Sequence, residues 1–155
     1  KLNYICLMPT NMYGPNDNYD LNNSHFFPAL IKKIYKAKIK KKNYVQIWGN
    51  GKAKRELMYV DDVADACEFF LKKNIKHTLI NIGTGYEKTI KDFCYFIMKK
   101  INCNLKIRFD KKKPNGTPRK ILNCKLAKSY GWKSKFSLEK GFETTLKNFI
   151  QNKKK

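Results

Sequence analysis

Apolar and polar positions repeat with two different periods along the chain, which indicates a mixture of strands and helices. Short apolar runs typical of strands are followed by stretches in which apolar residues recur every three or four positions, as on one face of a helix. The expected strands are 2–8, 44–48, 55–60, 79–82 and 105–109, and the expected helices are 26–35, 62–71, 90–101 and 138–150, with a short helical turn within 121–132. The pattern therefore predicts the α/β or α+β class.

Turns and helix caps refine these elements. Gly49-Asn50-Gly51-Lys52 separates two strand-like runs, so a β-hairpin is expected there. Ser, Thr, Asn and Asp before a helical run are candidate caps. The candidates are Asn23 or Ser24, Asp61 or Asp62, Thr89 with Asp92, and Ser137.

The segment Pro9–His25 is rich in Pro, Asn, Gly and Asp, and we expect it to be a long ordered loop between a strand and a helix. An open α/β sheet binds its ligands at the carboxyl ends of its strands. His25, one of two histidines, closes this loop. Any chemistry is therefore expected here. The segment Lys111–Lys120 is a second expected loop, because its Pro and Gly disfavour regular structure.

The composition is compatible with a packed core. Of 155 residues, 42% are hydrophobic and 14% aromatic, which disfavours disorder. No apolar run has the length of a membrane span, and no signal-peptide pattern is present. The chain has no initial Met and begins with a strand-like run, so residues are expected upstream.

The five cysteines are scattered without CxxC spacing, which favours reduced thiols in a cytosolic protein and no metal site.

The net charge of +22 comes from lysine, because only three of the 34 basic residues are arginines. A nucleic-acid-binding module is one interpretation. A lysine- and asparagine-rich background on solvated faces is the other, and it is favoured because no zinc-finger, RRM or basic-zipper pattern is present. A phosphate-bearing ligand would also gain from such a field.

Seven segments together carry a family resemblance. PTNMYGP at 9–15, RELMYVDDVADA at 55–66 and NIGTG at 81–85 resemble the extended short-chain dehydrogenase/reductase superfamily. Within it, four further segments resemble the GDP-L-fucose synthase family. They are PNDNYDLNNSHFFPALIKKI at 15–34, VQIWGNGKAKREL at 45–57, KPNGTPRK at 113–120 and GW at 131–132. Order and spacing match along essentially the whole chain.

The resemblance implies an α/β fold, the C-terminal part of a Rossmann-like enzyme. The family's glycine-rich fingerprint and its Ser and Tyr-xxx-Lys residues match nothing here, so residues 1–155 are expected to form the C-terminal half. Residues 1–24 would end the nucleotide domain, and 25–155 would be mainly substrate domain with segments returning to the nucleotide domain. Alone, this half is expected to be inactive.

The activity implied by the resemblance has two parts. The family epimerises C3 and C5 of GDP-4-keto-6-deoxy-D-mannose and then reduces C4 with NADPH, giving GDP-L-fucose. Epimerisation beside a ketone needs an acid and a base, and a histidine suits such a role. The family's catalytic histidine, which also lies in its cofactor site, maps onto His25. Its catalytic cysteine lies in the other half and has no counterpart here. The cofactor NADP(H) would be lined at its nicotinamide end by Pro9, Thr10, Asn11 and Met12.

The substrate positions of the family are Lys33, Trp48, Arg55, Asn115 and Lys120. Arg55 can bind a diphosphate with two parallel hydrogen bonds, and Trp48 can stack on a sugar or base. Lys33 stands where the family often has Arg, and Asn115 where it usually has Asp. The resemblance further implies a cytoplasmic enzyme, a homodimer at full length, with no metal, nucleic-acid or membrane partner.

Two alternatives stay open. The first is another nucleotide-sugar epimerase or dehydratase of the same superfamily, and the second is the basic nucleic-acid-binding module without catalysis. Trials with GDP-sugars, UDP-sugars and nucleic acid would separate the three.

Overall fold

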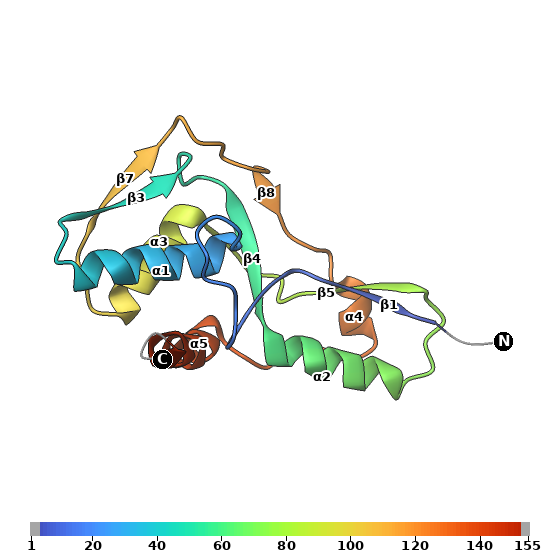
Figure 1. The fold of residues 1–155 in the computed structure, drawn as a ribbon. Helices are drawn as coiled ribbons and strands as arrows, with labels where there is room; N and C mark the ends of the chain where they lie inside the picture. The colour runs from blue at the N-terminus through green and yellow to red at the C-terminus, as the bar shows by residue number, and fades with distance from the viewer. Residues whose placement is uncertain (1–3, 153–155) are drawn as a thin grey trace. The chain divides into compact units, whose positions relative to one another are not determined.

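The computed structural model describes residues 4–152 and confirms a mixed α/β fold with parallel strand pairing (Figure 1). The strands are β1 (Cys6–Pro9), β2 (Asn11–Tyr13), β3 (Tyr44–Trp48), β4 (Lys54–Tyr59), β5 (Leu79–Ile82), β6 (Glu87–Thr89), β7 (Lys106–Asp110) and β8 (Arg119–Lys120). The helices are α1 (Phe26–Ile39), α2 (Val60–Leu71), α3 (Ile90–Lys100), α4 (Lys125–Ser129) and α5 (Leu138–Asn152).

The chain forms two compact units, each assembled from segments that are distant in sequence. Unit 1 contains residues 4–16, 56–87 and 121–152, and unit 2 contains Asp17–Arg55 and Lys88–Lys120. Strands β4 and β6 carry the chain across the boundary between the units. Because no single cut separates the units, each is a product of long-range contacts rather than of one continuous stretch.

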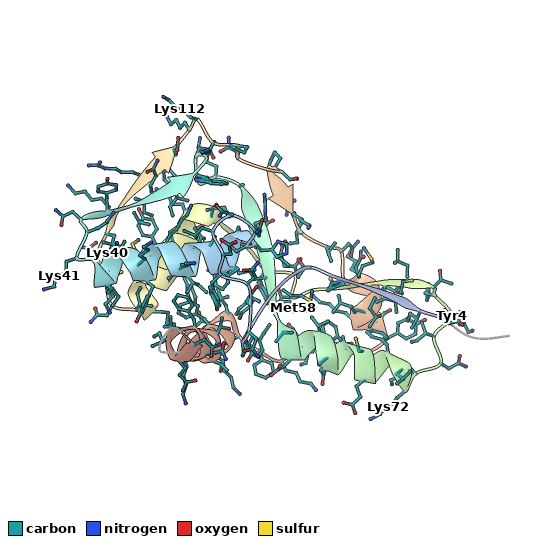
Figure 2. All side chains as sticks on the ribbon, in the orientation of Figure 1. Tyr4, Lys40, Lys41, Met58, Lys72 and Lys112 are labelled. Carbon is teal, nitrogen blue, oxygen red and sulfur yellow. The ribbon has the colours of Figure 1, made fainter. Side chains whose placement is uncertain are left out.

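Unit 1 is built around two parallel strand pairs. Strand β1 pairs with β5, and β2 pairs with β4 along Leu57–Tyr59. The core contains the central Met58, which Figure 2 labels, and residues from both strands and helices. Its buried members are Met58, Ala66, Phe70, Ile80, Ile82, Ala127 and Trp132. Helix α4 packs on β5, so the short helical turn expected in 121–132 is confirmed as a helix that closes this core.

In unit 2, helix α1 packs against β3 of the parallel pair β3–β7, and α3 packs against α1 (Figure 1). Apolar residues at helical spacing bury one stripe of α1, including Phe27, Ile31 and Ile34. Alternation in β3 buries Val45 and Ile47 and leaves the side chains between them outside. The amphipathic patterns read from the sequence thus correctly locate the core of this unit.

The predicted hairpin between the second and third strands is wrong. Strand β3 pairs with β7 in parallel, and β4 pairs in parallel with β2 and with β8. The turn between them is real, since Gly49 and Gly51 both have φ of +74°. It is held by a distant segment, because Asn115 Oδ1 accepts the Asn50 N–H at 2.7 Å. A turn signal describes local geometry only, whereas the strand partners are selected by burial of non-local apolar faces.

The expected loops also contain short strands. The segment Pro9–His25 includes β2, and the second loop ends in β8. The first strand is shorter than predicted over its described part and half-exposed rather than buried, with Cys6 and Met8 open to solvent; positions 2–3 lie outside the described residues. A run of two or three residues is too short to show a period, which explains why the pattern missed β2 and β8.

Two of the predicted helix caps are wrong and two are confirmed. His25 is the N-cap of α1 and Tyr59 that of α2, neither with a side-chain cap bond, while Asp61 and Asp62 lie in the first turn of α2. Asp62 is fully buried and accepts the backbone N–H groups of Lys135 and Phe136, at 2.7 and 3.3 Å. The confirmed caps are Thr89 with Asp92, which form a capping box, and Ser137, whose Oγ accepts the Lys140 N–H at 3.2 Å.

Candidate active site

The segment Pro9–Met12 runs from the end of β1 into β2, at the carboxyl end of a parallel strand. The Thr10 N–H donates to Ile82 O at 2.9 Å, and Thr10 is 5% exposed. Its Oγ1 is buried and has no hydrogen-bond partner among residues 4–152. Such an atom is costly unless something completes its bonding, so Thr10 is a candidate ligand contact.

The side chains of Asn11 and Met12, which follow Thr10, differ in how readily they could contact a ligand. Asn11 Nδ2 donates to Glu56 O at 2.8 Å, which commits this amide to holding β2 beside β4. The side chain of Met12 is 47% exposed. This segment therefore offers one buried hydroxyl and one exposed thioether rather than four equivalent contacts.

Glu56 is a fully buried carboxylate that sequence reasoning missed. Its Oε1 accepts the Gly85 N–H at 2.7 Å and the Thr84 hydroxyl at 3.2 Å, and its Oε2 accepts the Leu122 N–H at 3.0 Å. A Cβ on Gly83 would lie 2.5 Å from Oε1, so only glycine leaves room for the carboxylate. The motifs at 55–66 and 81–85 are thus parts of one hydrogen-bonded arrangement. The signal for it was the single acid inside the buried run of β4.

His25 is exposed and ends the loop that precedes α1. Asp17, in the same loop and unit, accepts the Asn18 N–H at 2.7 Å. The pKa of Asp17 is raised above its usual value, chiefly by burial, while the charge of His25 acts in the lowering direction. The two side chains are therefore within electrostatic reach of each other. Sequence reasoning missed Asp17, although the loop's acidic residues were visible.

Lys33 and Trp48 are brought together in unit 2, by α1 and by the end of β3. The Lys33 ammonium lies 4.8 Å from the centroid of the Trp48 ring, and Lys113 places a second ammonium 5.3 Å from it. All three line one cavity of about 560 Å³, which we call the Trp48 pocket. Burial lowers the pKa of Lys33 below its usual value, so an anion beside it would favour its charged form.

Further residues give the Trp48 pocket its charge. Lys36, Lys40 and Lys42 line it in addition to the two lysines at the tryptophan, and Asp110 is the only acid among the described residues of its wall. The indole of Trp48 is 52% exposed. The pocket therefore combines an open aromatic face with a positive field, which suits a ligand that has both a ring and phosphate groups.

Arg55 and Lys120 are also brought together. They are register partners on the adjacent parallel strands β4 and β8, so both side chains leave the same face. Arg55 Nη1 donates to Thr117 O at 2.6 Å and to Lys54 O at 2.7 Å, which fixes the guanidinium. A Cβ on Gly116, whose φ is +68°, would lie 3.2 Å from Nη2. The glycine thus keeps one edge of the guanidinium open.

Asn115 lies apart from the Trp48 pocket. Its Oδ1 closes the turn at Asn50, as described above, and it lines a second cavity of about 380 Å³ together with Lys52 and Lys111. An aspartate at this position would provide the same oxygen acceptor. Asn115 therefore supplies the acceptor that the turn needs without adding a negative charge.

Two of the five cysteines, Cys94 and Cys124, are buried. Burial raises the pKa of the Cys94 thiol to about 12 and that of the Cys124 thiol to about 11, which makes both unreactive. Residues 4–152 contain no group of three His, Cys, Asp or Glu side chains that could bind a metal ion. Within the same range, no helix is long and apolar enough to cross a membrane.

Comparison with known proteins finds relatives that match nearly the whole chain. A GDP-L-fucose synthase from Sinorhizobium fredii is 43% identical over 150 residues, which cover 97% of this chain and 48% of that protein. A GDP-L-colitose synthase from Yersinia pseudotuberculosis is 38% identical over 99% of this chain and 50% of its own length. The chain thus spans about half the length of these relatives.

The fold has solved counterparts as well. A crystal structure of a GDP-L-fucose synthetase from Naegleria fowleri bound to NADP superimposes with a TM-score of 0.86 and 25% identity, over 97% of this chain and 47% of that one. The family profile described as the NAD dependent epimerase/dehydratase family matches residues 1–83, more than half of the chain. The chain belongs to the NAD dependent epimerase/dehydratase family.

Proposed function

We propose that this chain is part of a GDP-L-fucose synthase, which epimerises GDP-4-keto-6-deoxy-D-mannose at C3 and C5 and then reduces C4. The observation that carries the proposal is the similarity to enzymes of that name along nearly the whole chain. The arrangement of the site supports it, since Lys33 meets Trp48 in one pocket and Arg55 stands beside Lys120. Both groupings have the chemistry that a nucleotide-sugar requires.

NADP(H) is the proposed cofactor, and it would supply the hydride for the reduction. Residues Pro9–Met12 would line its nicotinamide end. The buried, unpartnered Thr10 Oγ1 fits this role, because a ligand carrying an amide or hydroxyl would complete its hydrogen bonding. The Asn11 side chain would act indirectly, by holding β2 on β4.

His25 is the proposed acid or base for epimerisation and would also contact the cofactor. Removal and return of a proton beside a ketone needs a group that can exist in both forms near neutral pH, as histidine does. Its exposed position at the start of α1 leaves the ring accessible to a ligand. Asp17, within electrostatic reach of His25, would act as a positioning residue.

Lys33, Trp48, Arg55, Asn115 and Lys120 are the proposed substrate contacts. The fixed guanidinium of Arg55 and the ammonium of Lys120 project from the same face of the sheet. Together they would bind the diphosphate. Lys33 would add charge beside Trp48, which would stack on a ring of the nucleotide-sugar. The amide of Asn115 would contribute a neutral contact.

The proposal extends to the whole enzyme. The chain would supply the end of the nucleotide domain and most of the substrate domain, joined to an N-terminal half that carries the glycine-rich fingerprint. The complete enzyme would be a cytoplasmic homodimer without a metal, as expected from the family resemblance.

Replacement of His25 by alanine tests the catalytic proposal in the chain joined to that N-terminal half. We expect exchange of the C3 and C5 protons with deuterated water, followed by NMR, to fall by at least about 100-fold. NADPH binding should stay mostly intact, because Pro9–Met12 would still line the cofactor. His77→Ala is the matched control, because His77 is exposed and bonds Tyr130 instead. Exchange at the wild-type rate in His25→Ala would exclude His25 as the acid or base.

A second candidate is synthesis of a related GDP-sugar. The similarity to a GDP-L-colitose synthase favours it over a UDP-sugar activity. Turnover of a 3,6-dideoxy-4-keto sugar in preference to the 6-deoxy-4-keto substrate would select this alternative.

A further inference from the structure

We propose that Asp110 recognises the base of the nucleotide in the Trp48 pocket and selects guanine. The inference rests on the proposed function, because it takes a nucleoside diphosphate as the ligand. It adds a specificity-determining residue that neither the sequence motifs nor the family positions point to. The whole pocket belongs to unit 2, so its geometry is complete within one compact unit.

Asp110 and Trp48 are aligned by the sheet. They are register partners on the parallel strands β7 and β3, so both side chains leave the same face of the pair. Both line the pocket, and the indole is half-exposed. A base that stacks on the Trp48 ring would therefore present one of its edges toward the Asp110 carboxylate.

The carboxylate is held in a fixed orientation. Asp110 Oδ1 accepts the Lys112 N–H and Oδ2 accepts the Gln46 amide, each at 3.1 Å. Gln46 lines the same pocket. Because an ionised carboxylate has about four lone-pair sites, each oxygen of Asp110 can accept one further hydrogen bond. The group is thus a two-oxygen acceptor that is already positioned.

The negative charge of Asp110 is better explained by a contact with the base than by a contact with the phosphate groups. Lysines at positions 33, 36, 40, 42 and 113 line the pocket and would attract a diphosphate. A single carboxylate among them weakens that attraction, since it repels phosphate. Its presence is explained if it binds a part of the ligand that offers hydrogen-bond donors.

Guanine is the base with the matching edge. Its N1–H and N2 amino group are two adjacent donors, which two carboxylate oxygens can accept side by side. Uracil places its single N3–H between two carbonyl oxygens, and these would face the carboxylate unfavourably. Adenine and cytosine each pair an amino donor with a ring-nitrogen acceptor. Among the four bases, only guanine satisfies both oxygens of Asp110.

The wild-type chain tests the inference without any substitution. Calorimetric titration of the full chain with GDP, IDP and UDP should give the tightest binding for GDP. IDP lacks only the N2 amino group, so its affinity should be about tenfold lower, as expected for one lost hydrogen bond to a charged acceptor. Equal affinities for GDP and IDP would overturn guanine recognition by Asp110.

The variant Asp110→Asn then tests whether Asp110 causes the preference for guanine. Asparagine keeps an oxygen for the Lys112 N–H and removes the charge. We expect GDP binding to weaken at least about tenfold, while UDP binding stays equal or tightens because phosphate repulsion is lost. The matched control is Asp61→Asn, which removes an exposed negative charge in unit 1, outside the pocket.

The outcomes separate the inference from the proposed function. If Asp110→Asn shifts GDP and UDP in parallel, the pocket binds phosphate without reading the base. If GDP, IDP and UDP bind the wild-type chain equally, the nucleotide-sugar function stands and guanine selection fails. If none of the three binds, both proposals fail. If Asp110→Asn does not fold, the GDP-to-IDP comparison still decides.

Discussion

At the scale of single residues, Glu56 shows how a buried carboxylate can join separate segments of the chain. Its two oxygens accept three hydrogen bonds, from the 84–85 turn and from the segment after β8. A buried carboxylate is costly unless it is fully hydrogen-bonded, and here the bonding partners are mostly fixed backbone groups. Glu56 therefore joins three segments of unit 1 that are far apart in the sequence.

The variant Glu56→Gln should lower the free energy of unfolding by about 2 kcal/mol, because an amide nitrogen replaces one acceptor oxygen and faces an N–H donor. Urea denaturation followed by circular dichroism would measure the change. The exposed Glu68→Gln serves as control, since its i,i+4 ion pair with Lys72 is solvated and should contribute little to stability. A loss no larger than that of the control would mean that the carboxylate is not structurally required.

The sequence named candidate site residues but not their groupings. The family motifs point to Lys33, Trp48 and Arg55 as candidates, and the structure brings the first two together in one pocket. Asp110 and Asp17 were missed because neither stands in a recognisable motif. Each can be recognised as a candidate only from a neighbour in the fold. For Asp110 that neighbour is Trp48, its strand register partner, and for Asp17 it is His25, which lies within electrostatic reach.

At the scale of elements, helices were predicted more accurately than strand partners. The capping box at Thr89 and Asp92 is a local arrangement of four residues, and it is present with both of its hydrogen bonds. The hairpin failed because pairing of β3 with β7 joins residues about sixty positions apart, from Tyr44 with Lys106 to Trp48 with Asp110. Local chemistry can therefore indicate where an element starts, as at Thr89 and Ser137, but not what it pairs with.

Replacement of Thr89 by alanine should destabilise the chain by about 1 kcal/mol, because the Asp92 N–H at the start of α3 loses its acceptor. Thermal unfolding would measure the change. Thr78→Ala is a suitable control, since Thr78 is exposed and precedes a strand rather than a helix. If both variants unfold at the same temperature, the cap contributes nothing to stability.

At the scale of the whole molecule, the charge of +22 is distributed over exposed lysines on many elements. Figure 2 labels four of them, Lys40 and Lys41 at the end of α1, Lys72 at the end of α2 and Lys112 beyond β7. Such a field draws anions toward the surface from a distance, and salt screens it. The lysine-lined Trp48 pocket concentrates part of this charge at one place.

Binding of GDP to the chain should therefore weaken on the order of tenfold as salt rises from about 0.05 M to about 0.5 M. Titrations at several salt concentrations would measure the slope. A single-stranded oligonucleotide is the comparison ligand. If it binds more tightly than GDP at physiological salt, the nucleic-acid interpretation of the charge replaces the nucleotide-sugar one.

The discontinuous composition of the two units has a consequence for synthesis on the ribosome. Unit 2 ends at Lys120, so all of its segments are available while the last part of the chain is still being made. Unit 1 must wait for the residues after 120. Its Tyr13 hydroxyl donates to Leu138 O, 125 residues later in the sequence. Of the two units, unit 2 should thus be the first to become complete, and Tyr13 in unit 1 should gain its partner at Leu138 only after that later segment has been synthesised.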